Sequence, residues 1–372
     1  MIALVPYFTK PFPDDSGNRQ SFLDGLRGLA VLMVITVHTA HTLGIPNANW
    51  FTSVAFSGER GVQLFFLVSA FTLWQTTRKR WLSEQKPWIS FYIRRAFRIL
   101  PLWFLMTPVF AIATHLVTAT NILGTIFFFN GFLRYRETYE IVISGGWSIF
   151  IECLFYAAFP FIFIFSKTIL RTMILLVSFL TISIVWLTFA EKLGVPTTGK
   201  RFIFHHPLTH FFCFPLGVFI AQWLSSEEKT PLRRLMEDRR CIACYPILVL
   251  VALPLNFYVA SISLGLLFIS ASKPSTWFAK FCTLRLMQSL GQYAYSIYFL
   301  HFLVLRSLSY AIEETGIRSA INWSSPGWIC FGACTFVTVI AISFRLGKTI
   351  FEKFERPCIN YGRQMVGKTY EP

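Results

Sequence analysis

Long apolar stretches without a charged residue alternate along the chain with short basic segments. A membrane-spanning helix needs about 17–25 mostly apolar residues, and most of these stretches reach that length. Strands of a membrane barrel would instead show segments of about ten residues with strict alternation, which the sequence lacks. The pattern therefore predicts an all-α, polytopic integral membrane protein. The stretches without Asp, Glu, Lys or Arg are 28–58, 61–77, 99–133, 153–166, 172–190, 202–226, 241–272, 286–305 and 319–344.

These stretches predict about ten transmembrane helices. The stretch 241–272 can hold two short helices, separated at Pro254-Leu-Asn256. The segment 121–146 does not fit a full crossing, because Arg134 and Arg136 follow its short apolar run at once. It is expected to be a re-entrant or interfacial segment on the outer side. The predicted spans are 26–43, 60–76, 99–118, 147–165, 172–190, 205–224, 241–255, 257–272, 287–310 and 327–345.

Composition and charge agree with a chain whose solvent is lipid. Hydrophobic residues make up 54% and charged residues only 14%, against about 25% charged in a soluble domain; mean hydropathy is +0.55. A net charge of +16 could indicate nucleic-acid binding, but the basic residues gather between the spans, as the positive-inside rule requires. With ten spans and a cytosolic N-terminus, 26 of the 34 Lys and Arg residues are cytosolic. Both termini are therefore predicted to be cytosolic, in the inner membrane if the source is bacterial, and no nucleic-acid partner is expected.

Three ionisable side chains fall within predicted spans, where such groups are costly and usually mark function. His38 and Glu152 lie about five residues from the outer ends of their spans, and His301 lies somewhat deeper, so at 1.5 Å per residue all three can face one cavity in the outer half of the membrane. A histidine beside a carboxylate is a general-base arrangement. The alternative is that each histidine is a buried polar group bonded to a neighbouring helix.

Basic residues at the opposite, cytosolic ends of the helices are candidates for binding a phosphorylated ligand. Arg27 lies on the same predicted helix as His38, about 16 Å away along the axis. Arg95 and Arg98, at the predicted cytosolic start of the third span, have i, i+3 spacing and share a helix face. Such a pair suits phosphate oxygens. The alternative is that these arginines only anchor the helices at the cytosolic surface.

Several ordered motifs resemble those of the membrane acyltransferase 3 family. The opening Leu23-Asp-Gly-Leu-Arg-Gly-Leu-Ala30, followed by His38, resembles its Arg-x10-His element. The signature Trp-Ser-Leu-x-x-Glu-x-x-Phe-Tyr is matched around Glu152, and the late Gly-x-x-Ser-x-x-x-Tyr-x-x-His element around His301. The matching segments are Gly61-Val-Gln-Leu-Phe-Phe-Leu-Val-Ser-Ala70, Phe91-Tyr-Ile-Arg-Arg-Ala-Phe-Arg-Ile-Leu-Pro101, Gly146-Trp-Ser-Ile-Phe-Ile-Glu-Cys-Leu-Phe-Tyr156, Gly291-Gln-Tyr-Ala-Tyr-Ser-Ile-Tyr-Phe-Leu-His301 and Glu355-Arg-Pro357.

The resemblance implies a transmembrane acyltransferase domain over 23–357, with a cytosolic leader at 1–22 and a cytosolic tail at 358–372. It implies transfer of an acyl group, most often acetyl, from cytosolic acyl-CoA to a hydroxyl of an extracytoplasmic polysaccharide, glycolipid or related acceptor. His38, Glu152 and His301 are then expected to be catalytic, and Arg27, Arg95 and Arg98 to bind the CoA phosphates. Trp147, Ser148 and Tyr156 are expected to bind substrate. Acyl-CoA would be a donor substrate, with no permanently bound cofactor and no metal, and membrane lipid would surround the domain.

Two other functions fit the same polytopic pattern. A proton-coupled transporter or flippase could use the buried histidines and Glu152 as a proton relay, but many such folds show inverted repeats, and no repeat is detectable here. A membrane scaffold would leave the buried ionisable groups without a role. Release of free thiol from acetyl-CoA distinguishes the acyltransferase from both alternatives.

Overall fold

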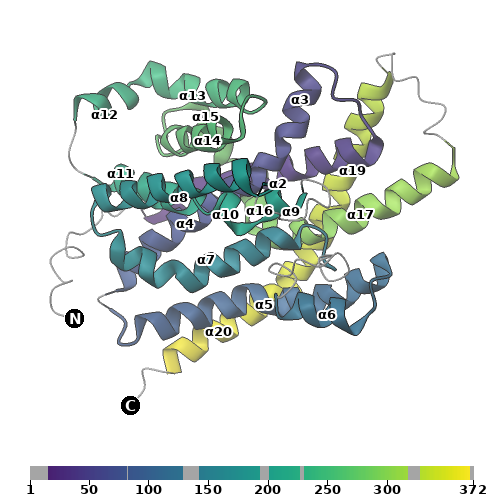
Figure 1. The fold of residues 1–372 in the computed structure, drawn as a ribbon, viewed down its shortest axis with the longest axis horizontal. Helices are drawn as coiled ribbons and strands as arrows, with labels where there is room; N and C mark the ends of the chain where they lie inside the picture. Colours follow the sequence, from purple (N-terminus) through teal and green to yellow (C-terminus); the bar gives the residue numbers. More distant parts are fainter. Residues whose placement is uncertain are drawn as a thin grey trace. The chain divides into compact units, whose positions relative to one another are not determined.

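The computed structural model describes residues 16–81, 83–128, 142–192, 201–226, 230–316 and 327–368 (Figure 1). The described residues form helices and connecting turns, without a strand among them. Within these ranges, seven helices are long and apolar enough to cross a membrane, which confirms the prediction of an all-α, polytopic membrane protein. They are Ser21–Leu43, Pro87–Thr114, Gly146–Phe165, Ile169–Phe189, Pro207–Ser225, Ala294–Glu314 and Ile329–Gly367.

Helices also occupy the three other predicted spans. The second is α4 (Gly61–Arg80), which ends in three consecutive basic residues. The stretch 241–272 divides as predicted into α13 (Arg239–Ala252) and α14 (Phe257–Ala271). Asn256 begins α14 by accepting a hydrogen bond from the backbone N–H of Tyr258 at 2.9 Å. The Ser270 hydroxyl donates to the Ile242 carbonyl at 3.0 Å, so the two short helices form an antiparallel hairpin.

The helix that carries the arginine cluster begins earlier than predicted. The charge-free run suggests a start at 99, whereas α5 spans Pro87–Thr114. Pro87 opens the helix because proline is favoured in the first turn, where its missing N–H needs no partner. Arg95 and Arg98 therefore lie well inside α5, where their chemistry depends on what packs against them.

The chain divides into two compact units. The first comprises the described parts of Ser69–Ser225 and Glu352–Pro372; the second is built from Asp15–Val68 and Ser226–Phe351. In the second, α3 (Trp50–Phe56), η2 (Ser57–Arg60), α12 (Pro231–Met236), α15 (Trp277–Cys282), α16 (Arg285–Gln292), α17 (Ala294–Glu314) and α19 (Gly327–Ile350) accompany α13 and α14. Additional elements of the first unit are α6 (Ala119–Ile126), α8 (Ile169–Phe189), α9 (Arg201–His205), α10 (Pro207–His210) and α11 (Cys213–Ser225).

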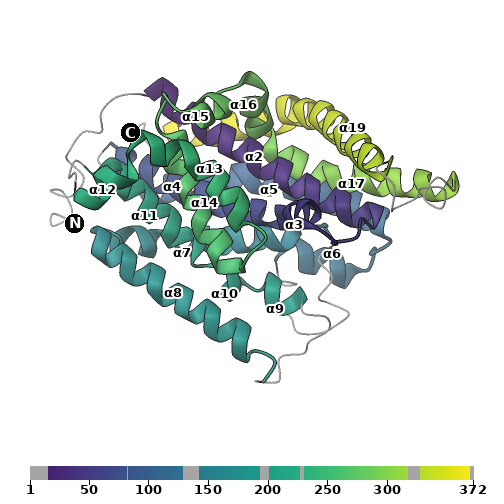
Figure 2. The same ribbon diagram turned by 90° about the horizontal axis from the view of Figure 1, so that it is seen from above.

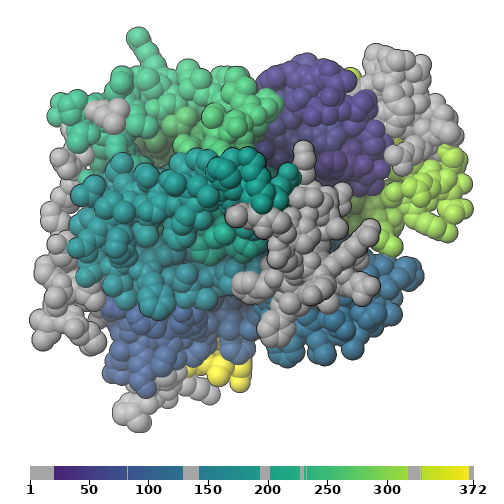
Figure 3. All heavy atoms as spheres, viewed as in Figure 1, coloured from purple at the N-terminus to yellow at the C-terminus, as the bar shows by residue number. Residues whose placement is uncertain are grey.

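Stacked phenylalanines form the core of the first unit around α7 (Gly146–Phe165). Phe155 stacks on Phe214 of α11 at a centroid distance of 3.9 Å, and Phe159 stacks on Phe91 of α5 at 5.1 Å. By contrast, α8 is apolar but largely exposed, and its teal side chains lie on the surface in Figure 3. An apolar helix with so little protein contact presents its side chains to lipid.

The end of the chain also belongs to the first unit. A π-helical turn, η4 (Phe351–Glu355), leads into α20 (Arg356–Lys368), which packs along α5 (Figure 1). The ring of Phe97 lies 5.6 Å from that of Tyr361. Gly362 faces Phe97 so closely that a Cβ would lie 2.6 Å from the phenylalanine side chain. This packing brings Glu355 next to α5.

In the second unit, α2 (Ser16–Leu43) lies directly against α15 and α16 (Figure 2). Glycines make this approach possible. A Cβ at Gly25 would overlap the backbone of Cys282, one at Gly28 the carbonyl oxygen of Met287, and one at Gly291 the carbonyl of Asp24. The glycines of the motifs at 23–30 and 291–301 therefore have the same structural role, which is to allow close contact between these helices.

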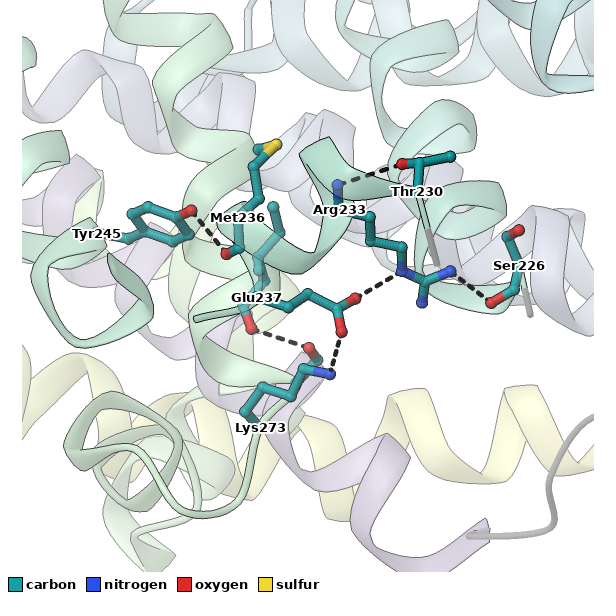
Figure 4. Close-up of polar contacts among 9 residues, drawn as sticks. Ser226, Thr230, Arg233, Met236, Glu237, Tyr245 and Lys273 are labelled. Carbon is teal, nitrogen blue, oxygen red and sulfur yellow. Dashed lines mark hydrogen bonds and ion pairs between the residues drawn. The ribbon is translucent and has the colours of Figure 1, made fainter. Parts of the chain in front are cut away.

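An ionic cluster joins the two basic segments that flank the α13–α14 hairpin. Glu237 lies between Arg233 and Lys273 (Figure 4), with Arg233 Nε donating to one carboxylate oxygen at 2.8 Å and Lys273 Nζ to the other at 2.9 Å. The Tyr245 hydroxyl donates to the Met236 carbonyl at 2.7 Å. Segments 229–240 and 273–285, both predicted to be cytosolic, thus meet at the same end of the hairpin.

Candidate active site

Two histidines from distant parts of the sequence lie side by side in the second unit. His38 of α2 is half-buried, and His301 of α17 has no exposed surface. Their ring centroids are 5.4 Å apart. Phe302 lies against both rings, at 4.5 Å from His38 and 4.0 Å from His301. Because α2 and α17 pack along each other, two of the three predicted catalytic residues share one apolar-walled site.

The hydrogen bonding of His301 determines which ring nitrogen can act. Its Nδ1 lies 3.2 Å from the Ile297 carbonyl oxygen. A carbonyl oxygen only accepts, so Nδ1 carries the proton and Nε2 of the neutral ring keeps a lone pair. Nε2 is enclosed and has no hydrogen-bond partner in the described part of the chain. Since an enclosed polar atom without a partner costs free energy, Nε2 is an acceptor ready for an N–H or O–H group.

Glu152 lies on α7 in the first unit, at the centre of a group of hydroxyls. The Tyr156 hydroxyl, one helical turn later, donates to Oε1 at 2.5 Å. Ser69 of α4 donates its hydroxyl to the same oxygen at 2.7 Å. The two hydroxyl oxygens are 3.3 Å apart. A carboxylate in an apolar setting requires such donors, and two of them here hold one of its oxygens.

Arg95 and Arg98 share a helix face, as predicted, but meet different neighbours. The guanidinium carbon of Arg95 lies 5.8 Å from the centroid of the Tyr156 ring, within cation–π range. Arg98 lies 3.8 Å from a carboxylate oxygen of Glu355 and keeps 29% of its side chain exposed. Arg98 thus keeps part of its guanidinium exposed beside a carboxylate, whereas the Nε of Arg95 is enclosed.

Two other basic residues, Arg94 and Arg27, contact carboxylates at shorter distances than Arg98 does. Arg94 makes a two-pronged contact with Glu84, with both nitrogen–oxygen distances 2.9 Å. In the second unit, Arg27 contacts Asp24 at 2.6 Å, one turn earlier on α2. The predicted phosphate-binding residue Arg27 therefore has an intrahelical carboxylate beside it.

All three residues predicted to bind substrate make contacts within the first unit. The Trp147 ring stacks on His205 at 4.4 Å and lies 5.1 Å from His210. Ser148 is buried, and its hydroxyl donates to the Gly145 carbonyl at 3.0 Å. Tyr156 belongs to the hydroxyl group around Glu152. These contacts give all three a structural task at the start and middle of α7.

Comparison with known families shows which family the chain belongs to. A family model described as an acyltransferase domain matches residues 20–345. The chain belongs to this acyltransferase 3 family. The motifs that contain His38, Glu152 and His301 all lie within the matched region. The protein is an integral, multi-pass membrane protein.

Curated relatives of the chain carry O-acetyltransferase names. A Staphylococcus aureus (strain MRSA252) protein named "Putative O-acetyltransferase" is 25% identical, over 93% of this chain and 65% of its own length. The Listeria monocytogenes protein named "Peptidoglycan O-acetyltransferase" is 24% identical, over 94% of this chain and 58% of its own length. The chain thus spans less than two thirds of the length of these relatives. No solved structure matches the acyltransferase.

The site contains residues that sequence reasoning did not single out. Ser69 falls within the motif at 61–70, but nothing in that motif indicates contact with Glu152. Glu355 belongs to the closing motif, and its partner Arg98 lies far away in sequence. A single cavity shared by His38, Glu152 and His301 stays a prediction. Within the described ranges, no group of three or more His, Cys, Asp and Glu side chains could hold a metal ion.

Proposed function

We propose that this acyltransferase moves an acetyl group from acetyl-CoA to a hydroxyl of an extracytoplasmic glycan, with His38 as the general base. The observation that carries the proposal is the contact between His38 and the enclosed ring of His301. An imidazole is the side chain suited to accept a proton from a hydroxyl near neutral pH. The name of the Listeria relative supports a peptidoglycan-like acceptor.

In the proposed reaction, His38 takes the proton from the acceptor hydroxyl as its oxygen attacks the thioester carbonyl. The carbon–sulfur bond of acetyl-CoA breaks, the CoA sulfur leaves, and the proton from His38 completes the thiol. His301 offers its Nε2 lone pair to an N–H of His38 or to a substrate hydroxyl, and so holds the reacting groups in place. Glu152 supplies a carboxylate that stabilises the imidazolium formed during transfer.

The donor would be held through its phosphates by Arg27 and Arg98 at the predicted cytosolic side. Arg98 is the stronger candidate because its contact with Glu355 is loose and part of its guanidinium is exposed. Charge-assisted hydrogen bonds from arginine to phosphate are short and can be bidentate. The acyl group would then reach His38 through the length of the pantetheine arm.

The test uses the purified full chain in lipid vesicles, with acetyl-CoA and soluble peptidoglycan fragments. We expect free thiol to appear together with an acetyl-sized mass increase on the glycan. His38→Ala should abolish both, whereas His41→Ala, which removes an exposed ring 6.4 Å away on the same helix, should retain both. Glycan movement across the vesicle without thiol release would instead support a transporter. Full activity in His38→Ala would reject His38 as the base.

A further inference from the structure

The carboxylate of Glu152 is held on one side only. Ser69 and Tyr156 both donate to Oε1, at 2.7 and 2.5 Å. Oε2 makes no hydrogen bond to a described residue. Each hydroxyl has a single hydrogen, so two donations to Oε1 use both of them. One carboxylate oxygen is thereby fixed and the other is left as an acceptor.

The two donors reach Glu152 from different helices. Tyr156 follows Glu152 by four residues on α7, so its hydroxyl approaches along the same helix. Ser69 comes from a different helix, α4, and its hydroxyl reaches the same carboxylate oxygen. Donors from two directions restrict rotation of the carboxylate about its side-chain bonds more than one donor does. Tyr156, which is buried, further limits where the group can move.

Arg95 completes the group from a third helix, α5. Its guanidinium lies over the Tyr156 ring, and its Nε is enclosed without a hydrogen-bond partner in the described residues. A positive charge near a half-buried carboxylate such as Glu152 offsets part of the cost of removing that carboxylate from water. This placement gives Arg95 a task within the first unit that differs from the phosphate binding proposed for Arg98.

We propose that Ser69 and Tyr156 are positioning residues for Glu152, which hold Oε1 so that Oε2 is kept as an acceptor in one fixed direction. The inference rests on the proposed function, in which Glu152 stabilises the imidazolium of the base. Catalytic groups must be held closely to their productive geometry by neighbours that are themselves fixed. In this proposal Ser69 acts through the hydrogen bond from its hydroxyl to Glu152, not through a contact with acetyl-CoA or the glycan.

The first experiment needs no turnover. An infrared difference spectrum between the wild-type protein and Glu152→Gln identifies the carboxylate band of Glu152. Ser69→Ala removes one of the two hydrogen bonds to Oε1, so we expect this band to shift, and Ser69→Thr, which keeps the hydroxyl, should restore it. Thr76→Ala is the matched control, because the Thr76 hydroxyl lies on the same helix but bonds only to backbone carbonyls of α4. An unshifted band in Ser69→Ala would overturn the inference, whatever the activity of the protein.

The second experiment separates positioning from donor binding. In Ser69→Ala we expect kcat to fall about 10- to 100-fold, the size typical of losing a group that orients a functional side chain. KM for acetyl-CoA should stay within about two-fold, because no ground-state contact with the donor is lost. Ser69→Thr should recover most of kcat, and Thr76→Ala should behave as the wild type. Thermal midpoints of the purified variants ensure that folded protein is compared.

Tyr156→Phe provides an independent check, since it keeps the ring under Arg95 and removes only the hydroxyl. If both hydroxyls act through Glu152, their effects on kcat are coupled. The loss of kcat in the Ser69→Ala, Tyr156→Phe double variant, expressed as a free energy, should then differ from the sum of the two single losses. A loss in Ser69→Ala confined to KM would overturn the inference in favour of donor binding. A wild-type protein that acetylates nothing would reject the proposed function, while the infrared result would still decide the contact with Glu152.

Discussion

The imidazole rings of His38 and His301 lie 5.4 Å apart, although they come from the first and ninth predicted spans. The contact depends on α2 and α17 packing along each other. Phe302 covers both rings, so the pair has an apolar wall on one side. In such surroundings, an exchange of protons between an imidazole and a hydroxyl is shielded from bulk water.

The histidine pair makes a graded prediction. His38→Ala should reduce transfer about 10²–10⁴-fold, the range expected for loss of a general base. His301→Ala should be milder, because its role is to orient the reacting groups through Nε2. His41→Ala should leave the rate unchanged. Acetylated glycan is measured by mass spectrometry at matched protein levels, and near-normal product from His38→Ala would contradict the mechanism.

Arg98 should determine the affinity for the donor. Loss of a charge-assisted contact costs about 1.5–3 kcal/mol, so Arg98→Ala should raise KM for acetyl-CoA about 10- to 150-fold. Arg98→Lys should rescue only part of this, because an ammonium cannot form the bidentate fork. Arg94→Ala is the control, since Glu84 already engages the Arg94 guanidinium through both nitrogens. Equal KM values for the variants and the wild type would return Arg98 to membrane anchoring.

The Glu237 cluster makes the second unit sensitive to acid. Burial alone would raise the pKa of Glu237, but hydrogen bonds from Arg233 and Lys273 outweigh it and leave the pKa below its ordinary value. Such a group stabilises the fold above its unfolded pKa, which is about 4.3, and this contribution is lost as the pH falls through the lowered pKa.

We therefore expect Glu237→Gln to lower the thermal midpoint at pH 7, with a loss of about 1 kcal/mol from removing a half-buried charge-assisted contact that solvent partly screens. The difference between variant and wild type should shrink below about pH 4. A difference in thermal midpoint between variant and wild type that stays constant from pH 7 to pH 3.5 would mean that ionisation of Glu237 does not contribute to the stability of the fold.

The contact of α2 with α16 should not tolerate a methyl group. A Cβ at Gly291 would overlap backbone atoms of Asp24, which cannot rotate away as a side chain can. Gly291→Ala should cost about 1–3 kcal/mol or more and reduce the yield of folded protein. Gly332→Ala is the control in the same unit, because the nearest atom there would be the end of the Ile45 side chain at 3.6 Å. Thermal midpoints in detergent measure both, and equal values would argue against the close approach.

Topology can be tested apart from activity. The distribution of basic residues predicts that the tail after Arg345 is cytosolic and that the segment 191–200 is outside. Reporter fusions after position 372 should be active only as cytosolic reporters, and a tag inserted at 195 should react with an impermeant reagent added outside. The opposite result at the C-terminus would reverse the assignment of Arg98 to the cytosolic side.

The class of fold could be predicted from the sequence, and so could the ionisable residues within the spans. The side chains that contact those residues could not. Runs without charge locate apolar helices, but they miss the true start of α5 because Arg95 and Arg98 interrupt the run while remaining helical. Spacing along one helix predicted that the two arginines share a helix face, and the depth of His38 in the membrane stays a prediction. Spacing could not show that Ser69 meets Glu152 or that Arg98 meets Glu355, because these contacts depend on which helices pack together.

The glycine-lined contact of α2 limits which substitutions the protein can tolerate during evolution. In an ordinary core, a substitution is absorbed when adjacent side chains adopt new rotamers. At Gly25, Gly28 and Gly291 backbone meets backbone, so no rotamer is available to compensate. His38 lies on the same unbroken helix. A shift of this helix at the glycines would therefore also move His38. Functional variants are therefore expected to retain these glycines and to accumulate their changes on other surfaces of the protein.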